Sequence, residues 1–153
     1  MKKALKIALV VLAVLFVIAQ FVRPDRSAPP IDPAQSLEAN AVVPADVKVI
    51  LQRSCADCHT NATVYPWYSN ISPASWFLQN HINEGRHELN FSEWATYSAK
   101  KKNKKFEEIC EQVTSREMPL PSYLWIHGDA AMSDDEIKVL CAWAESQRVE
   151  IPQ

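Results

Sequence analysis

The sequence contains very little glycine: Gly85 and Gly128 are the only two among 153 residues, against ten prolines. Scarce glycine disfavours a turn-rich all-β fold, and no segment shows the alternation of apolar and polar residues typical of a half-buried strand. The net charge is −2, so no positive excess indicates nucleic acid as a partner. The 48 % apolar share is sufficient for a packed core. These limits favour one all-α domain with an N-terminal appendage.

The chain opens on a basic and apolar segment. Three lysines lie within its first six residues, and an uncharged run follows from Ile7 to Ala19. From Ala4 to Val22 the segment has about 19 residues, the length of a transmembrane helix, if the Lys6 side chain snorkels to the membrane surface. We predict that residues 1–22 form a signal anchor, crossing the inner membrane once with the body in the periplasm. A signal peptide cleaved after Ala19 is the alternative.

A proline-rich stretch separates this segment from the body. Four prolines fall between residues 23 and 33, a density that excludes a helix and predicts an extended, semi-rigid linker over residues 23–35. The remaining residues, 36–150, are predicted to form one domain. The domain organisation is therefore a targeting segment, a linker and a single folded body.

Within the body, apolar residues recur at helical spacing in five stretches. Ser133 and Glu136 form a capping box at the start of the last stretch, and Ser72 with Pro73 marks the start of the second. The second helix is expected to end near Gly85. The predicted helices cover residues 43–55, 72–85, 90–100, 104–115 and 133–147. Residues 117–132 are predicted to form an ordered loop.

The motif that carries chemistry is Cys55-Ala-Asp-Cys58-His59. A structural zinc site needs a second close ligand pair, which the sequence lacks, and a thioredoxin-like redox pair needs a preceding strand. Covalent haem attachment uses all three functional residues: the two thiols form thioethers with the haem vinyl groups, and His59 becomes the proximal ligand of the iron. We predict one haem c per chain, with Cys55, Cys58 and His59 as its binding residues.

A second axial ligand of the iron is expected from the loop after residue 115. Met118 lies just before a proline, so its thioether can be held against the iron without a helix carrying it, and Met/His is a standard axial pairing. Filling of a core gap is the alternative role for this side chain. His81 is the second candidate for the distal position. His127 is a candidate for binding a haem propionate.

Two cysteines lie outside the motif. Cys110 and Cys141 fall on the apolar faces of two predicted helices and are 31 residues apart in sequence. In an oxidising compartment such thiols can form a disulfide. Buried free thiols are the other possibility, and the sequence does not separate the two.

A block of positive charge lies between two of the predicted helices. Five of the six residues from Lys100 to Lys105 are lysines. A block of this kind is typical of a solvated helix junction, and we take that as the default. A docking patch for an acidic redox partner or for anionic lipid is the alternative.

Several stretches resemble the bacterial haem-binding domain family of small, single-haem cytochrome c-like proteins. The resemblance covers residues 36–150 and rests on Cys55, Cys58, His59 and on the segments YPWYSNISP, EGR, LNFSEW and EMP. It implies covalent haem c and a cytochrome c-like helical fold. Cys110 and Cys141 are not part of the family pattern.

Together these features predict a membrane-anchored, single-haem cytochrome that transfers electrons to or from an unidentified redox protein. No catalytic acid, base or substrate pocket is apparent, so we do not expect an enzyme. A haem-based sensor with a labile Met118, or an accessory haem subunit of a larger redox complex, is the alternative.

Overall fold

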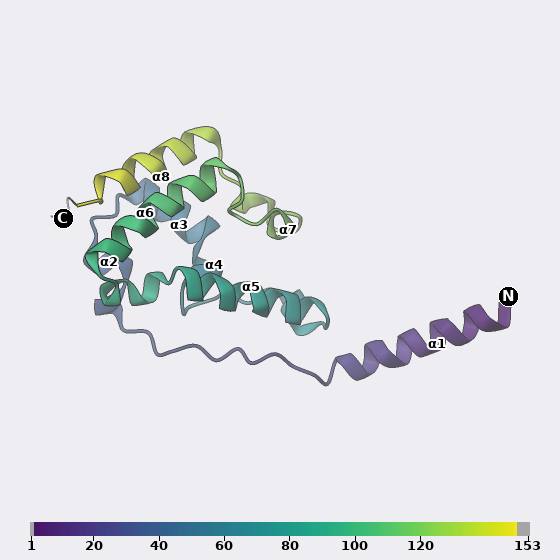
Figure 1. The fold of residues 1–153 in the computed structure, drawn as a ribbon. Coiled ribbons are helices and arrows are strands. Elements are labelled where there is room, and N and C mark those ends of the chain that lie inside the picture. The colour runs from purple at the N-terminus through teal and green to yellow at the C-terminus, as the bar shows by residue number, and fades with distance from the viewer. Residues whose placement is uncertain (1, 150–153) are drawn as a thin grey trace.

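The computed structural model describes residues 2–149, and every regular element in that range is a helix (Figure 1). The all-α prediction is therefore confirmed. Residue 150, the predicted end of the domain, lies outside the described residues. The α-helices are α1 (Lys2–Ala19), α2 (Leu37–Asn40), α3 (Ala45–Ser54), α4 (Ala56–His59), α5 (Ala74–Glu88), α6 (Ala99–Thr114), α7 (Pro121–Leu124) and α8 (Asp134–Ser146). The 3₁₀ helices are η1 (Pro33–Gln35), η2 (Trp67–Asn70), η3 (Phe91–Thr96) and η4 (Gly128–Ala130).

Local capping signals placed some helix ends correctly and missed others. The capping box of α8 is present, because Ser133 Oγ accepts from the Glu136 backbone N–H and the Glu136 carboxylate accepts from the Ser133 N–H. Helix α5 begins at Ala74, two residues after the start of the predicted range 72–85, with Pro73 as its N-cap. It also continues past Gly85, to Glu88. Gly85 is internal because it makes a close contact with α4, described below.

Helix α6 is longer than predicted and absorbs the lysine block. It begins after Ser98, whose hydroxyl accepts from the Lys101 N–H. The predicted helix over residues 90–100 is instead the short η3, with Asn90 as its cap. The lysines therefore form the first two turns of one helix, and the prediction that they lie at a helix junction is wrong. The loop over residues 117–132 is ordered, as predicted, but contains α7 and η4.

Three helices build the core that supports the site. Helix α6 packs along α8, and α3 packs against α8 from the other side. The Trp94 ring centroid lies 4.8 Å from that of Phe106, and Phe106 meets Trp143 edge to face at 5.5 Å. Aromatic contacts of this geometry add to the apolar burial that stabilises the packing.

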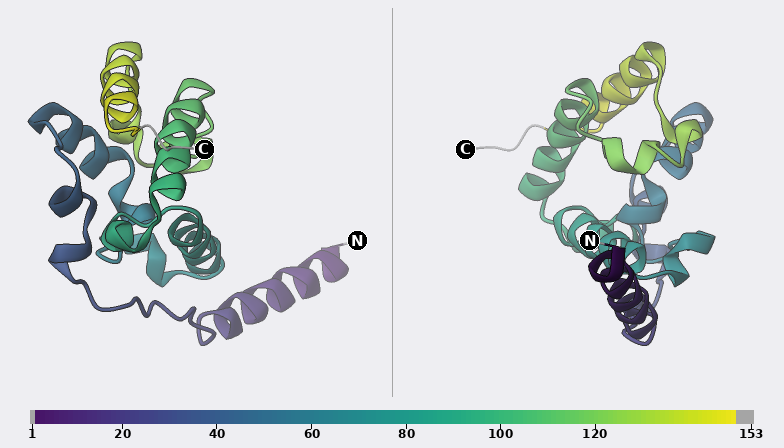
Figure 2. Two further views of the ribbon diagram at one scale, coloured as in Figure 1. Left: turned by 60° about the vertical axis from the view of Figure 1, so that its left-hand side comes forward. Right: turned by 90° about the vertical axis from the view of Figure 1, so that its right-hand side faces the viewer.

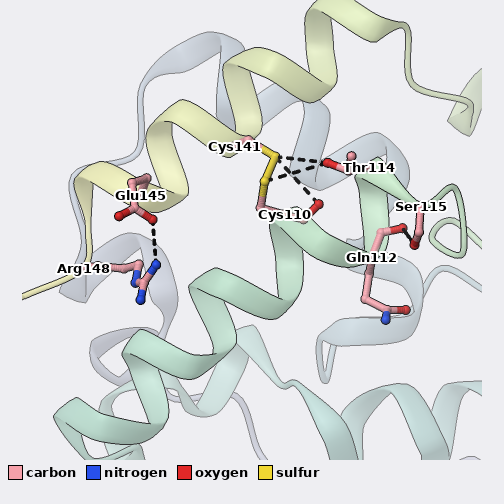
Figure 3. Close-up of a disulfide and its surroundings, with 7 residues drawn as sticks. All are labelled: Cys110, Gln112, Thr114, Ser115, Cys141, Glu145 and Arg148. Carbon is pink, nitrogen blue, oxygen red and sulfur yellow. Dashed lines mark hydrogen bonds and ion pairs between the residues drawn. A yellow bond between two sulfur atoms is a disulfide. The ribbon is translucent and has the colours of Figure 1, made fainter.

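A disulfide joins Cys110 in α6 to Cys141 in α8 (Figure 3). The two Cα atoms are 4.9 Å apart, within the range that a disulfide requires. Of the two states that the sequence leaves open for these cysteines, the structure has the disulfide. It fixes the α6–α8 pair next to the segment that leads from α6 to Met118.

Helix α1 projects away from the helical body, and its side chains contribute nothing to the core (Figures 1 and 2). Within residues 2–149, no helix combines the length and apolar character needed to cross a membrane. The transmembrane anchor predicted over residues 1–22 is therefore not supported. The physical reason is that α1 starts at Lys2 and carries three lysines near its start.

The first part of the linker is bound to the body. The Trp76 indole N–H donates to the carbonyl of Val22 at 2.8 Å, and the Gln20 side chain bonds both the N–H and the carbonyl of Ser72. The guanidinium of Arg26 bonds the carbonyl of Ser69 and lies 4.6 Å from the centroid of the Tyr65 ring. The segment from Gln20 to Arg26 is thus held against η2 and the start of α5.

Candidate functional site

The two motif cysteines and His59 are presented by one short turn of helix. Helix α3 ends where the Cys55 N–H bonds the Leu51 carbonyl, and α4 follows at once. The N–H groups of Cys58 and His59 both donate to the carbonyl of Cys55. Positions three apart lie on one side of a helical turn, so Cys55 and Cys58 face the same way. Both are free thiols in the structure.

The imidazole of His59 is oriented by a backbone carbonyl. Its Nδ1 lies 2.9 Å from the oxygen of Leu89, so the Nδ1–H donates there and Nε2 is left to bind a metal. Burial lowers the pKa of His59 below its usual value, and the charge of Lys105 acts in the same direction. The hydrogen bond to Leu89 has the opposite effect. The neutral ring is the form that coordinates iron.

Two cavities border this motif, with volumes of about 260 Å³ and 410 Å³. Four residues line both: Cys55, His59, Glu88 and Met118. The structure therefore brings Met118, 59 residues after His59 in sequence, to the same space as the motif. Their combined extent is in the range of cofactor sites.

Met118 is held in place by the way α6 ends. Arg116 adopts a left-handed conformation, with φ 62°, and the N–H groups of Glu117 and Met118 both bond the Gln112 carbonyl, at 3.0 and 3.1 Å. This arrangement closes the last turn of α6, as a Schellman cap does. The Met118 side chain packs against the core. Its position is thus fixed by backbone bonds and by apolar packing.

The two histidine candidates, His81 and His127, differ in whether they line the cavities. His81 lines only the smaller of the two cavities, and its ring lies against Phe77 with centroids 4.1 Å apart. His127 lines neither cavity: its Nε2 lies 2.8 Å from the Tyr68 hydroxyl, and its ring stacks on Tyr123 at 4.2 Å. Met118 is the candidate that shares both cavities with His59.

Both motif thiols are strongly disfavoured as thiolates. Burial raises the pKa of Cys55 to about 12, with the nearby Cys58 adding to the effect and Arg53 opposing it. Burial also raises the pKa of Cys58 to about 11, with the Asp57 charge adding and Arg86 opposing. Redox and zinc-binding cysteines act as thiolates with lowered pKa. Within residues 2–149 no cluster of three or more His, Cys, Asp or Glu side chains is placed to hold a metal ion.

Sequence reasoning missed the residue that lets α5 approach the motif. A Cβ built on Gly85 would lie 2.8 Å from the Cys58 carbonyl oxygen and 3.2 Å from the Cys58 Cβ. Only glycine leaves room for this contact between α4 and α5. The signal was the EGR triplet, where the glycine was taken to mark a helix end.

Two further supports of the motif come from distant segments. The Arg86 guanidinium donates to the Thr60 carbonyl and the Thr63 hydroxyl, both at 2.8 Å, and so fixes the loop after His59. The Tyr123 hydroxyl donates to the Asp57 carboxylate at 3.0 Å, linking α7 to α4. The nearby Asp57 charge adds to burial in raising the pKa of Tyr123. These contacts join residues 23, 26 and 66 positions apart and left no local pattern in the sequence.

Comparison with known proteins agrees with this geometry. The family description "haem-binding domain" matches residues 14–146, and the chain belongs to that family. The predicted resemblance is confirmed at this level, and family membership supports haem as the cofactor. No curated protein and no solved structure matches the chain.

The residues at the cavities fit a haem group. Two free thiols on one turn match two vinyl groups, Nε2 of His59 is available for iron, and the Met118 thioether borders the same space. Leu89, Phe91, Ile109 and Val113 supply an apolar wall for a macrocycle.

Proposed function

We propose that the protein is a single-haem c-type cytochrome that transfers electrons. Cys55 and Cys58 would hold the haem covalently, and His59 and Met118 would bind its iron. The observation that carries this proposal is the convergence of both motif thiols, His59 and Met118 on adjoining cavities. Bound haem supplies an iron that cycles between the ferric and ferrous states by one electron.

The chain's own residues attach and hold the cofactor. Each thiol would hold the haem through a thioether to one vinyl group, an addition that would need no oxidant and would release no leaving group. Leu89 keeps the His59 ring in the tautomer that leaves Nε2 free. The backbone bonds at Glu117 and Met118 fix the Met118 backbone at the end of α6. Little rearrangement then accompanies electron transfer.

No catalytic role is included in this proposal. The redox partner is a protein that exchanges single electrons with the haem. We place the body outside the cytoplasm, because a disulfide is typical of an oxidising compartment and because a basic head followed by residues 7–16 is typical of an export signal.

Covalent attachment is tested by a haem stain on a denaturing gel, with the protein produced alongside a cytochrome c maturation system. We expect the wild-type chain to keep its haem, and the variant with both Cys55→Ala and Cys58→Ala to lose all of it. Met118→Ala is the matched control, since it should retain the stain. Deleting residues 2–19 should also prevent staining, because the body would stay in the cytoplasm. An unstained wild-type chain would overturn the proposal.

The distal ligand is tested by Met118→Ala. Loss of the thioether should abolish the red charge-transfer band of the ferric form and lower the reduction potential by an amount on the order of 0.1 V, since axial ligands set haem potentials over a range of about 0.8 V. The ferrous variant should bind carbon monoxide quickly, while the wild type should not. Absorption spectra and redox titration measure both effects. An unchanged band would exclude Met118, and rapid binding by the wild type would favour a sensor.

A further inference from the structure

One lysine of the basic block is buried in the wall of the candidate haem site. Lys105 is only 8 % exposed and lines the larger cavity together with His59 and Met118. It shares one face of α6 with Ile109, Gln112 and Val113, which line the same cavity. The charge of Lys105 is therefore directed at the site, unlike that of a solvated lysine.

The ammonium group is held by two carboxylates. Its Nζ lies 2.6 Å from Oε2 of Glu108 and 3.6 Å from Oε2 of Glu88. Burial raises the pKa of Glu108, but the hydrogen bonds and charges of Lys105 and Lys104 outweigh this and lower it overall. Glu108 is thus ionised at neutral pH, and its pairing with Lys105 offsets part of the cost of burying a charge.

The surroundings of this group make its charge effective. The cavity wall is apolar at Leu89, Phe91, Ile109 and Val113, so the field of a buried charge is weakly screened by solvent and salt. Lys104 provides a contrast within the same turn. It pairs with the same Glu108 at 3.2 Å, but its side chain is 73 % exposed.

We propose that the buried ammonium of Lys105 raises the reduction potential of the haem iron bound by His59. A fixed positive charge in the wall of the site destabilises the ferric form, which carries one more positive charge than the ferrous form. Lys105 does not bind the iron. Its charge acts on the iron through space. The inference rests on the haem site proposed above.

The experiment is a redox titration of the holoprotein and its variants, with a haem stain on each sample. Lys105→Met removes the charge and keeps an unbranched side chain, and its midpoint potential should fall. Lys105→Arg keeps the positive charge, so its midpoint potential should match that of the wild type. Glu108→Gln removes the carboxylate nearer to the ammonium, at a side chain that is 32 % exposed, and its potential should rise.

Lys104→Gln is the matched control. Its potential shift should be several times smaller than that of Lys105→Met and should vanish at high salt, whereas the Lys105→Met shift should persist. A Lys105→Met shift no larger than that of Lys104→Gln would overturn the inference. If Lys105→Met does not fold, Lys105→Gln decides: it removes the charge and keeps a side chain that can hydrogen-bond Glu108, and an unchanged or higher potential overturns the inference. If the Lys105 inference fails but the wild-type protein still stains for haem, the haem proposal stands. If the wild-type protein does not stain, the haem proposal and the Lys105 inference are both overturned.

Discussion

Gly85→Ala is expected to destabilise the protein and to reduce the fraction of chains that carry haem. The added Cβ would lie 2.8 Å from the Cys58 carbonyl oxygen, a backbone atom that cannot rotate away. Helices α4 and α5 would have to separate, and overpacking of this kind costs about 1–3 kcal/mol. The intrinsic helix preference of alanine over glycine returns up to about 1 kcal/mol, so the net loss is roughly 1–2 kcal/mol. Because Cys58 moves with α4, thioether formation should suffer as well.

The measurement is a pair of assays on the same preparation: denaturant unfolding, and the ratio of haem to protein absorbance. Gly128→Ala is the matched control, because a Cβ at that position has no atom within 4 Å. It should be neutral or slightly stabilising, since alanine restricts the unfolded chain. Equal stability and haem content in Gly85→Ala and the wild type would show that the α4–α5 contact is not tight.

Removing the disulfide is expected to have the larger effect on stability. The Cys110–Cys141 bond closes a loop with a sequence separation of 31 residues. The chain-entropy account gives such a loop about 3–4 kcal/mol of stabilisation. The variant with Cys110→Ala and Cys141→Ala should therefore lose that amount, and its Tm should fall by roughly 10–15 °C. The haem spectrum should be retained below the new Tm, because neither cysteine lines the cavities.

Two observations check the disulfide independently. Under the proposed attachment, Cys55 and Cys58 are blocked as thioethers, so alkylation of the denatured holoprotein should label no cysteine before reduction and two after it. Unfolding of the wild-type protein under reducing conditions should then match that of the double variant. Labelling of Cys110 and Cys141 without reduction would show that they are free thiols. The double variant unfolding like the wild type would contradict the expected stabilisation.

Features that depend on neighbouring residues were predictable from the sequence. The capping box of α8 uses atoms three positions apart, and the turn that carries Cys55, Cys58 and His59 lies within five residues. Both follow from local backbone geometry, which the sequence specifies directly. The family that the segments around the motif resemble is likewise a property of the sequence.

Other features were misjudged because a local rule met a tertiary contact. Glycine commonly ends a helix, but Gly85 lies inside α5 because Cys58 approaches it. A block of lysines is commonly solvated, but Lys105 is buried because α6 turns that face toward the cavity and supplies Glu108 as a partner. The sequence could not show either contact, because the partners come from packing.

The sequence by itself therefore determined the helical class, the motif turn and the candidate ligands, since each depends on periodicity, spacing or residue chemistry within a short stretch. The tertiary structure decided that Met118 reaches the cavities of His59, that Cys110 pairs with Cys141 and that Lys105 faces the site. The physical reason is that each of these three facts joins segments that are distant in the sequence. Their proximity depends on how α5, α6 and α8 pack, and helix packing is a property of the whole fold.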